Sequence, residues 1–444
     1  MLKLNYKRTF FIGCAFFSIL MLWQVYNTYC PLMLEALLKE RFAQSEQLTY
    51  VIGIIMAMDN LFALFMLPIF GKLSDKTKTK YGRRMPYIII GMVLSAVFFP
   101  IIVVSFMKGS LVGLVIMMGI ILIIMNAYRS PAVALMPDVT PKPLRSTANG
   151  IINLVGYIGA IIAGALAMVF NKEENYLYSF IIASVFMIIA AVILIITIKE
   201  NKIVSQMADD MAKGEEMSQT IEVVSEDKKL SKEDHKNLWL ILISILFWFI
   251  SFNAVETYNS LFCKKVLDNT GLAGVFTIIL TVSSIITFAL SSNLANKIGR
   301  KMTVVIGLIS IIFGFVLICI YSYTPLIESG LIFFIYIAIV FLGIGWALIN
   351  INSYPMIVEM ANKKNVGAFT GKYYTFSMIG QTVTPVLVGL IMSFTESGIK
   401  VLYIYSLITM IIALVIFSFV KEKRDLIKKE KVKGFAALSN PDDN

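Results

Sequence analysis

The sequence predicts an all-α membrane protein with twelve transmembrane helices in two related six-helix halves. Composition is the first reason, because 58% of the 444 residues are hydrophobic and only 15% are charged, with a mean hydropathy of +0.80. These values lie outside the range of soluble domains. About twelve apolar runs are long enough to cross a bilayer as helices. A loop motif also occurs twice, about 220 residues apart, which indicates an internal duplication.

Each expected span is an apolar run of about 20 residues or more, the length that crosses roughly 30 Å of hydrocarbon. In chain order the spans are 9–38, 48–70, 86–107, 110–136, 146–170, 176–198, 238–262, 271–293, 302–322, 331–358, 366–394 and 398–420. The first run is too long for a secretion signal and lacks a small-residue cleavage site, so we expect it to be retained.

A polar segment, 199–236, separates the sixth and seventh spans and mixes acids with bases. Such a composition is typical of a solvated linker with room for one amphipathic helix. The expected organisation is therefore an N-terminal six-helix half (1–198), a cytoplasmic linker (199–236), a C-terminal six-helix half (237–422) and a cytoplasmic tail (423–444).

The positions of Lys and Arg predict the orientation, since positive charges near span ends are retained in the cytoplasm. With both termini inside, about 30 of the 39 Lys and Arg residues fall in cytoplasmic segments. The few on the outer side are Lys39, Arg41, Lys108, Lys172, Lys264, Lys265 and Lys400. We expect a multi-pass protein of the cell membrane. The net charge of +11 then reflects topology and contact with lipid headgroups, and not nucleic-acid binding.

The duplicated loop motif lies between two apolar runs in each half. Its first copy contains Gly71-Lys-Leu-Ser-Asp75 and then Gly82-Arg83-Arg84, and its second copy ends in Gly299-Arg300-Lys301. Glycine permits a tight turn, an acid can cap a helix start, and arginines hold a loop at anionic headgroups. We interpret these as gating loops on the cytoplasmic side. The expected gating residues are Gly71, Asp75, Gly82, Arg83, Arg84, Gly299 and Arg300.

Polar side chains are concentrated in the first, fourth, seventh and tenth spans, the same position in each three-helix unit. A polar group that faces lipid is costly, so these faces should turn inward. Amides and hydroxyls beside aromatic rings suit a polyhydroxylated ligand such as a sugar. An equally open alternative is that they only join helix to helix. The expected substrate-binding residues are Trp23, Gln24, Asn27, Asn126, Arg129, Asn253, Asn350, Ser353 and Tyr354. The spacing turns Trp248 away from the polar face.

Ionisable groups deep in spans are either paired or functional. The candidates for proton coupling or ion pairing are Asp59, Arg129 and Glu256, together with Glu35 nearer the outer surface. We hypothesise that Asp59 exchanges a proton and that Arg129 shifts its affinity for that proton. The alternative is a permanent structural ion pair. No cofactor or metal site is expected, because the four cysteines have no paired spacing and the one histidine, His235, lies in the linker.

The repeat extends beyond the loops, because Asn126 and Pro131 in the fourth span recur as Asn350 and Pro355 in the tenth. With this duplication the sequence resembles the major facilitator superfamily. The resemblance implies the major facilitator fold, a central cavity lined by the four polar spans, and alternating access by rocking of one half against the other.

Two segments narrow the resemblance. The first loop region, 68–87, is similar to that of the glycoside, pentoside and hexuronide cation symporters and of the sucrose/proton symporters. Residues 128–150 resemble the bacterial sucrose-type branch. Sodium-coupled members carry Asp-x-x-x-Asp-Pro in the second span, where this chain has Ala63, Leu67 and Pro68, with Asp59 one turn earlier. The comparison favours H+ over Na+ as the coupling ion.

The sequence therefore predicts a proton-coupled symporter for an oligosaccharide or glycoside that acts in the lipid bilayer as a monomer and is not an enzyme. Two other transport functions are an uncoupled facilitator and an exporter of drugs or metabolites. A non-transporting membrane sensor is the alternative from a different class.

Overall fold

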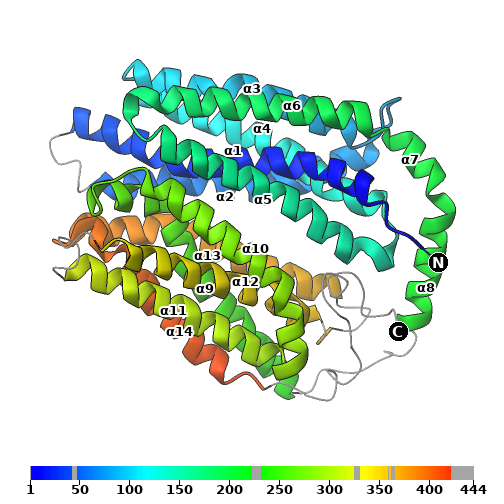
Figure 1. Ribbon diagram of the computed structural model, residues 1–444. Helices are drawn as coiled ribbons and strands as arrows, with labels where there is room; N and C mark the ends of the chain where they lie inside the picture. The colour runs from blue at the N-terminus through cyan, green and yellow to red at the C-terminus, as the bar shows by residue number, and fades with distance from the viewer. Residues whose placement is uncertain are drawn as a thin grey trace.

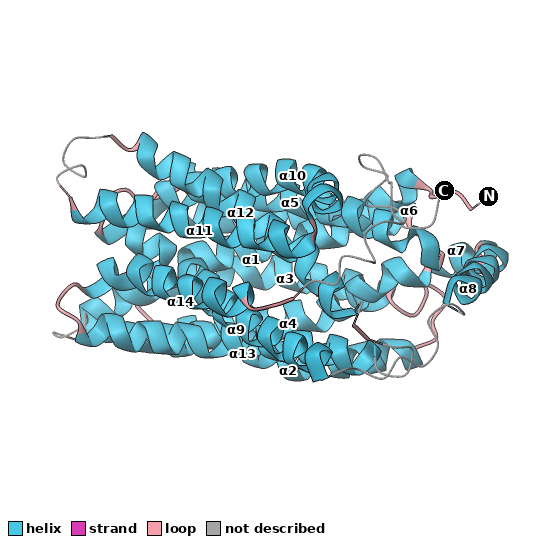
Figure 2. Cartoon of the chain, turned by 90° about the horizontal axis from the view of Figure 1, so that it is seen from below, coloured by secondary structure: helices cyan, strands magenta, loops and turns pink. Residues whose placement is uncertain are grey.

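The computed structural model describes residues 2–42, 48–222, 232–324, 331–358, 360–361 and 366–421. Within these ranges all regular structure is helical, and twelve helices are long and apolar enough to span a membrane. The predicted fold class is confirmed. Figures 1 and 2 show the long helices lying roughly side by side in one bundle.

The first six spans form the N-terminal half. They are α1 (Tyr6–Arg41), α2 (Thr49–Lys76), α3 (Met85–Met107), α4 (Leu111–Asp138), α5 (Arg145–Val169) and α6 (Tyr176–Thr197), with short 3-10 turns η2 (Lys142–Leu144) and η3 (Glu173–Asn175). The C-terminal half contains α9 (Lys232–Lys265), α10 (Leu272–Ile298), α11 (Arg300–Tyr323), α12 (Phe333–Val358), α13 (Val366–Phe394) and α14 (Val401–Ser418), with η6 (Gly398–Lys400).

The packing repeats from one half to the other. In the N-terminal half α1 packs on α5 and α6, and α4 packs on α2 and α3; the equivalent pairs α9 with α13 and α14, and α12 with α10 and α11, pack in the C-terminal half. Between the halves, α2 runs along α13 and α5 runs along α10. These two helix pairs occupy equivalent positions, so a pseudo-twofold axis relates one side of the interface to the other. In Figure 1 the N-terminal half lies above the C-terminal half.

The duplicated loops share a backbone feature. Gly82 has φ +119° and Gly299 has φ +92°, a left-handed region that side chains with a Cβ rarely adopt. Each glycine directly precedes an arginine, Arg83 or Arg300, at the start of the third span of its half. The equivalent placement supports the duplication that the sequence predicts.

The bundle has two distinct ends. We call the end where α1 begins, and where α7 (Glu200–Gln206) and α8 (Ala208–Glu222) lie, the linker end (Figure 1), and we call the opposite one the far end. Arg8 Nη2 donates to the carbonyl of Val139 (3.0 Å), which places the start of α1 beside the end of α4 at the linker end.

The two halves are joined from the middle of the bundle to the far end. Tyr258 Oη of α9 donates to the carbonyls of Thr49 (3.3 Å) and Pro385 (2.7 Å), which joins α9 to α2 and α13. Gly53 of α2 lies directly against the backbone of Pro385, where a Cβ would collide. Near the linker end of α13, by contrast, a Cβ on Gly371 would meet nothing within 4 Å. The described halves are therefore closed against each other at the far end.

The linker differs from the expected solvated segment. Two helices, α7 and α8, occupy its first part, and α9 begins at Lys232, inside the segment expected to be linker. Gly214 of α8 packs against Pro141 and Pro143 beside η2, so this part of the linker is fixed to the N-terminal half. The expected tail, 423–444, lies outside the described residues.

Candidate transport cavity and loop network

A cavity of about 360 Å³ lies between the two halves. Among the predicted residues, Trp23, Gln24 and Asn27 of α1, Arg129 of α4, and Asn253 and Glu256 of α9 line it. The first, fourth and seventh spans thus meet at one site, as their polar faces predict.

The charged and polar groups in this cavity join the two halves. The guanidinium of Arg129 lies 4.4 Å from the ring centroid of Trp23, a cation–π arrangement. Asn27 Nδ2 donates to Glu256 Oε1 across the interface (3.4 Å), and Gln24 Nε2 donates to Thr277 Oγ1 of α10 (2.8 Å). The cavity therefore offers amides, one cation and one carboxylate to a ligand.

Asp59 lies beside this cavity and does not line it. Its side chain is 6% exposed, and its Oδ1 has no hydrogen-bond partner among the described residues. The charge of Asp59 acts on Arg129, as does that of Glu256, although no ion pair between described residues joins Asp59 directly to Arg129. A buried carboxylate oxygen without a partner is costly as an anion, so Asp59 is suited to bind a proton.

Four predicted binding residues lie outside the cavity lining. Asn126 is fully buried and donates to the Leu122 carbonyl of its own helix (2.9 Å), and Asn350 donates to the Trp346 carbonyl (2.9 Å). Ser353 Oγ lies 3.5 Å from Tyr373 Oη, and Tyr354 Oη lies 3.2 Å from Thr370 Oγ1. Ser353 and Tyr354 join α12 to α13 and follow the helix-contact alternative, whereas Asn350 bonds within its own helix. Asn126 also hydrogen-bonds Asp59 of α2.

Several cavity residues were missed by the sequence analysis. Trp346 of α12 stacks on Phe252 of α9, with ring centroids 3.7 Å apart and an interplanar angle of 8°, and both line the cavity. Gln381 of α13 and Tyr157 of α5 line it as well. Trp346 lies one turn before Asn350, so the helical period could have placed it on the predicted face. Tyr157 and Gln381 lie in the fifth and eleventh spans, outside the four spans that were selected for their polar faces. Trp248 is buried and packs edge-on against Phe417, turned away from the cavity as predicted.

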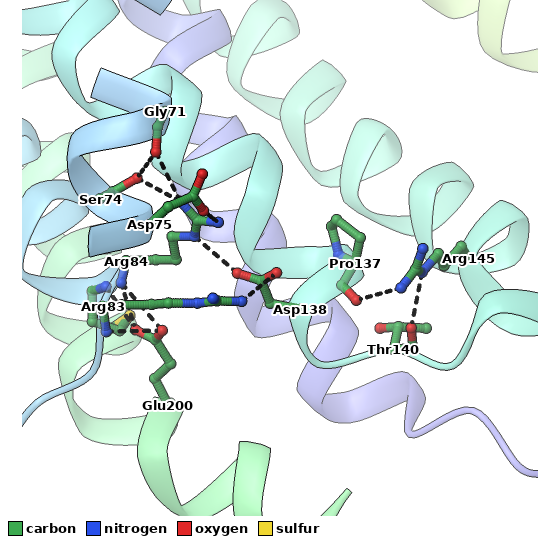
Figure 3. Close-up of polar contacts among 11 residues, drawn as sticks. Gly71, Ser74, Asp75, Arg83, Arg84, Pro137, Asp138, Thr140, Arg145 and Glu200 are labelled. Atoms are coloured by element: carbon green, nitrogen blue, oxygen red, sulfur yellow. Dashed lines mark hydrogen bonds and ion pairs between the residues drawn. The ribbon is translucent and has the colours of Figure 1, made fainter. Parts of the chain in front are cut away.

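The first loop motif is held by a charged network at the linker end (Figure 3). Arg84 is 4% exposed; its Nε pairs with Asp138 Oδ2 (2.8 Å), and its Nη2 pairs with Asp75. Arg83 Nη2 pairs with the other oxygen of Asp138 (2.8 Å). Burial opposes the charge of Arg84, but the carboxylates of Asp138 and Asp75 outweigh burial and raise the pKa of Arg84. The loop thereby joins α2, α3 and α4.

Glu200 of α7 completes this network, and the sequence analysis did not identify it. Its Oε1 accepts from the backbone N–H groups of Arg83 (3.0 Å) and Arg84 (3.1 Å), and its Oε2 accepts from those of Arg84 and Met85 (both 2.9 Å). A carboxylate at a helix N-terminus satisfies otherwise unpaired N–H groups and the helix dipole. Glu200 is 2% exposed, so the linker caps α3 from a separate helix.

Glu200→Gln should destabilise the protein by about 1–3 kcal/mol. The neutral amide offers one acceptor oxygen, whereas the charged carboxylate offers two. The melting temperature in detergent is the measurement. The matched control is Glu215→Gln on the same linker, which breaks an exposed pair with Lys142 (3.1 Å) and should cost less than about 1 kcal/mol. Equal melting temperatures for the two variants would contradict this role of Glu200.

Two pseudo-symmetric six-helix halves around a central polar cavity define a membrane transporter whose site lies between its halves. The chain belongs to the Major Facilitator Superfamily, whose sequence profile matches residues 12–352 and 275–441. Proteins of this superfamily move small molecules across the lipid bilayer.

Individual relatives are distant. A multi-drug resistance efflux pump PmrA homolog of Lactococcus lactis subsp. lactis (strain IL1403) is 21% identical over 403 residues, which cover 86% of this chain and 88% of the relative. A D-xylose-proton symporter structure matches with a TM-score of 0.66 and 14% identity over 94% of this chain and 99% of its own. A bacterial homologue of the iron transporter ferroportin in an inward-facing state matches with a TM-score of 0.66 and 14% identity over 95% and 100%. The structural likenesses show the fold alone.

Proposed function

We propose that this protein is a proton-coupled sugar importer of the cell membrane that works by alternating access as a monomer, without a cofactor and without enzymatic activity. The single observation that carries the proposal is the composition of the central cavity. Its amides come from both halves, namely Gln24, Asn27, Asn253, Asn259 and Gln381, and aromatic rings lie among them.

These groups match the chemistry of a sugar. Hydroxyl groups need paired donors and acceptors in a cavity that excludes bulk water, and a site built to supply them rejects ligands that lack hydroxyls. Aromatic rings such as Trp23 and Phe249 offer apolar surfaces to the carbon faces of a pyranose. A volume of about 360 Å³ is within the range of small-molecule sites. An oligosaccharide or glycoside is the substrate class that we favour.

The buried carboxylate supports proton coupling. Asp59 lies next to the cavity with one unpartnered oxygen, and Arg129, which lines the cavity, interacts through its charge with both Asp59 and Glu256. A substrate that engages Arg129 would change the cost of ionising Asp59. This link between substrate and proton is the basis for proposing symport, with H+ favoured over Na+.

The charge distribution supports an orientation with the linker end in the cytoplasm. The linker end carries Lys76, Lys78 and Lys80 beside Arg83 and Arg84, and such basic loops are retained inside. In that orientation both termini are cytoplasmic, the far end is the outer end, and the structure is closed toward the outside.

Drug export is the second candidate, and it has specific support. Phe249, Phe252, Phe276 and Trp346 form an aromatic wall in the C-terminal half of the cavity, and the curated relative is named as an efflux pump homolog. An amphipathic cation could stack there with its charge near Glu256.

Ligand binding to the purified protein separates the two candidates. Trp23 and Trp346 line the cavity, so a ligand that enters it should change the intrinsic tryptophan fluorescence. We expect saturable changes with one or a few glycosides and none with lipophilic cations. The matched control is Trp23→Phe, which keeps an aromatic ring and should reduce the signal. Saturable binding of lipophilic cations alone would favour the exporter.

A further inference from the structure

Ion pairs cross the interface between the halves at the far end. Lys264 Nζ of α9 lies 3.0 Å from Glu35 Oε2 of α1, and Lys265 Nζ lies 3.3 Å from Glu35 Oε1. Lys264 Nζ also lies 3.2 Å from Glu173 Oε1, in the turn before α6. One carboxylate of the N-terminal half is therefore held by two consecutive lysines of the C-terminal half.

The ion pairs depend on closure of the far end. Glu35 and Glu173 belong to one half and both lysines to the other, so separation of the halves at this end would break every one of these pairs. The ion pairs of the first loop, at the linker end, are arranged differently. Arg83, Arg84, Asp75 and Asp138 all lie within the N-terminal half, so those pairs can persist when the halves move.

The burial of the pairs suits reversible opening. The side chain of Glu35 is 11% exposed, and those of Lys264 and Lys265 are 29% and 31% exposed. A fully exposed pair contributes little, whereas a fully buried pair is hard to separate. A pocket of about 540 Å³ lies beside Glu35 and Lys265, between the two halves, and Glu396 and Lys400 also line it. Water in this pocket can hydrate the charges as they separate.

We propose that Glu35, Lys264 and Lys265 form an ionic gate at the far end that sets the balance between the far-end-closed and far-end-open states. These are positioning residues, since none of them lines the central cavity. The inference rests on the alternating-access part of the proposed function and is independent of whether the substrate is a sugar or the coupling ion a proton. Removing the carboxylate leaves Lys265 without its partner in the N-terminal half and Lys264 with Glu173 alone, so the attraction across the gap weakens and opening is favoured.

Distances between spin labels across the far end test the gate directly. Lys108→Cys, just after α3, and Leu331→Cys, just before α12, place labels on exposed positions of opposite halves outside the gate, in a background with the four native cysteines replaced. Wild type should show mainly the short, closed distance. Glu35→Gln should raise the ratio of open to closed molecules at least about fivefold over wild type, the lower end of typical coupling free energies. Glu35→Asp keeps a carboxylate, so its ratio should lie between those of wild type and Glu35→Gln.

The matched control is Glu174→Gln, an exposed carboxylate in the same turn as Glu173, and it should leave the distances unchanged. A distance distribution for Glu35→Gln equal to that of Glu174→Gln would overturn the gate and leave the proposed function standing. A single distance in wild type, with and without substrate, would overturn both, because no equilibrium would exist for the gate to set.

A salt titration of the labelled wild type gives the same test without altering the gate. Raising the ionic strength from about 0.05 M to about 1 M shortens the screening length to about 3 Å, so the open population should rise. An open population that does not change with salt would contradict an ionic gate.

Discussion

Asp59→Asn is expected to abolish proton-driven accumulation of the substrate while exchange of labelled for unlabelled substrate continues. The amide keeps the size and polarity of the side chain but cannot take up or release a proton. A proton gradient of one pH unit is worth about 1.4 kcal/mol, or about a tenfold concentration ratio for one coupled proton. Accumulation in proteoliposomes should fall from that ratio to equilibration.

Two further variants make the Asp59 experiment specific. Asp59→Glu keeps a titratable group and should retain part of the accumulation. In the wild-type protein the neighbouring Asn60 donates to the Gln381 carbonyl (3.1 Å). The double variant Asp59→Asn with Asn60→Asp moves the carboxylate to this neighbouring position, and it should not restore coupling if the position of the carboxylate matters. Accumulation by Asp59→Asn at the level of wild type would make Asp59 a structural residue.

Arg129→Lys is expected to weaken substrate binding by roughly 10- to 100-fold, or about 1.4–2.7 kcal/mol. The guanidinium lies over the Trp23 ring, with Cζ 4.4 Å from the ring centroid, and offers several N–H groups in a planar fork, whereas an ammonium is a point charge with no such plane. The dissociation constant, followed by tryptophan fluorescence or by counterflow, is the measurement.

The control for Arg129 is Arg145→Lys at the linker end. Arg145 donates to the backbone carbonyls of Thr140 (3.1 Å) and Pro137 (3.0 Å) and lines no part of the central cavity. Its replacement by lysine should leave the dissociation constant within about twofold of wild type. If Arg129→Lys bound substrate as tightly as Arg145→Lys, Arg129 would not belong to the binding site.

The fold could be predicted almost completely from the sequence, because length and hydropathy fix membrane spans and a duplicated loop fixes the relation between halves. The polar faces around Asn27 and Asn253 pointed to α1 and α9, which both line the cavity, because each helix carries several polar groups at helical spacing and the cavity can hydrate them.

The same reasoning failed for α12 because one or two polar residues do not distinguish a cavity from a helix contact. Ser353 and Tyr354 bond to α13, while Trp346 faces the cavity without any polar signal of its own. The positions of Glu35 and Glu200 also depend on tertiary structure. Glu35 forms ion pairs with lysines more than two hundred residues away in the chain, and Glu200 caps a helix that begins far earlier in the chain.

Uptake of labelled sugars into proteoliposomes under an imposed proton gradient, with a matched sodium gradient as the control, tests the central claim most directly. The proposed function predicts that at least one glycoside or oligosaccharide accumulates above equilibrium when protons flow inward, that the sodium gradient drives no accumulation, and that Asp59→Asn loses the effect. Equilibration of sugars regardless of either gradient, or proton-driven expulsion of lipophilic cations with no sugar uptake, would contradict it.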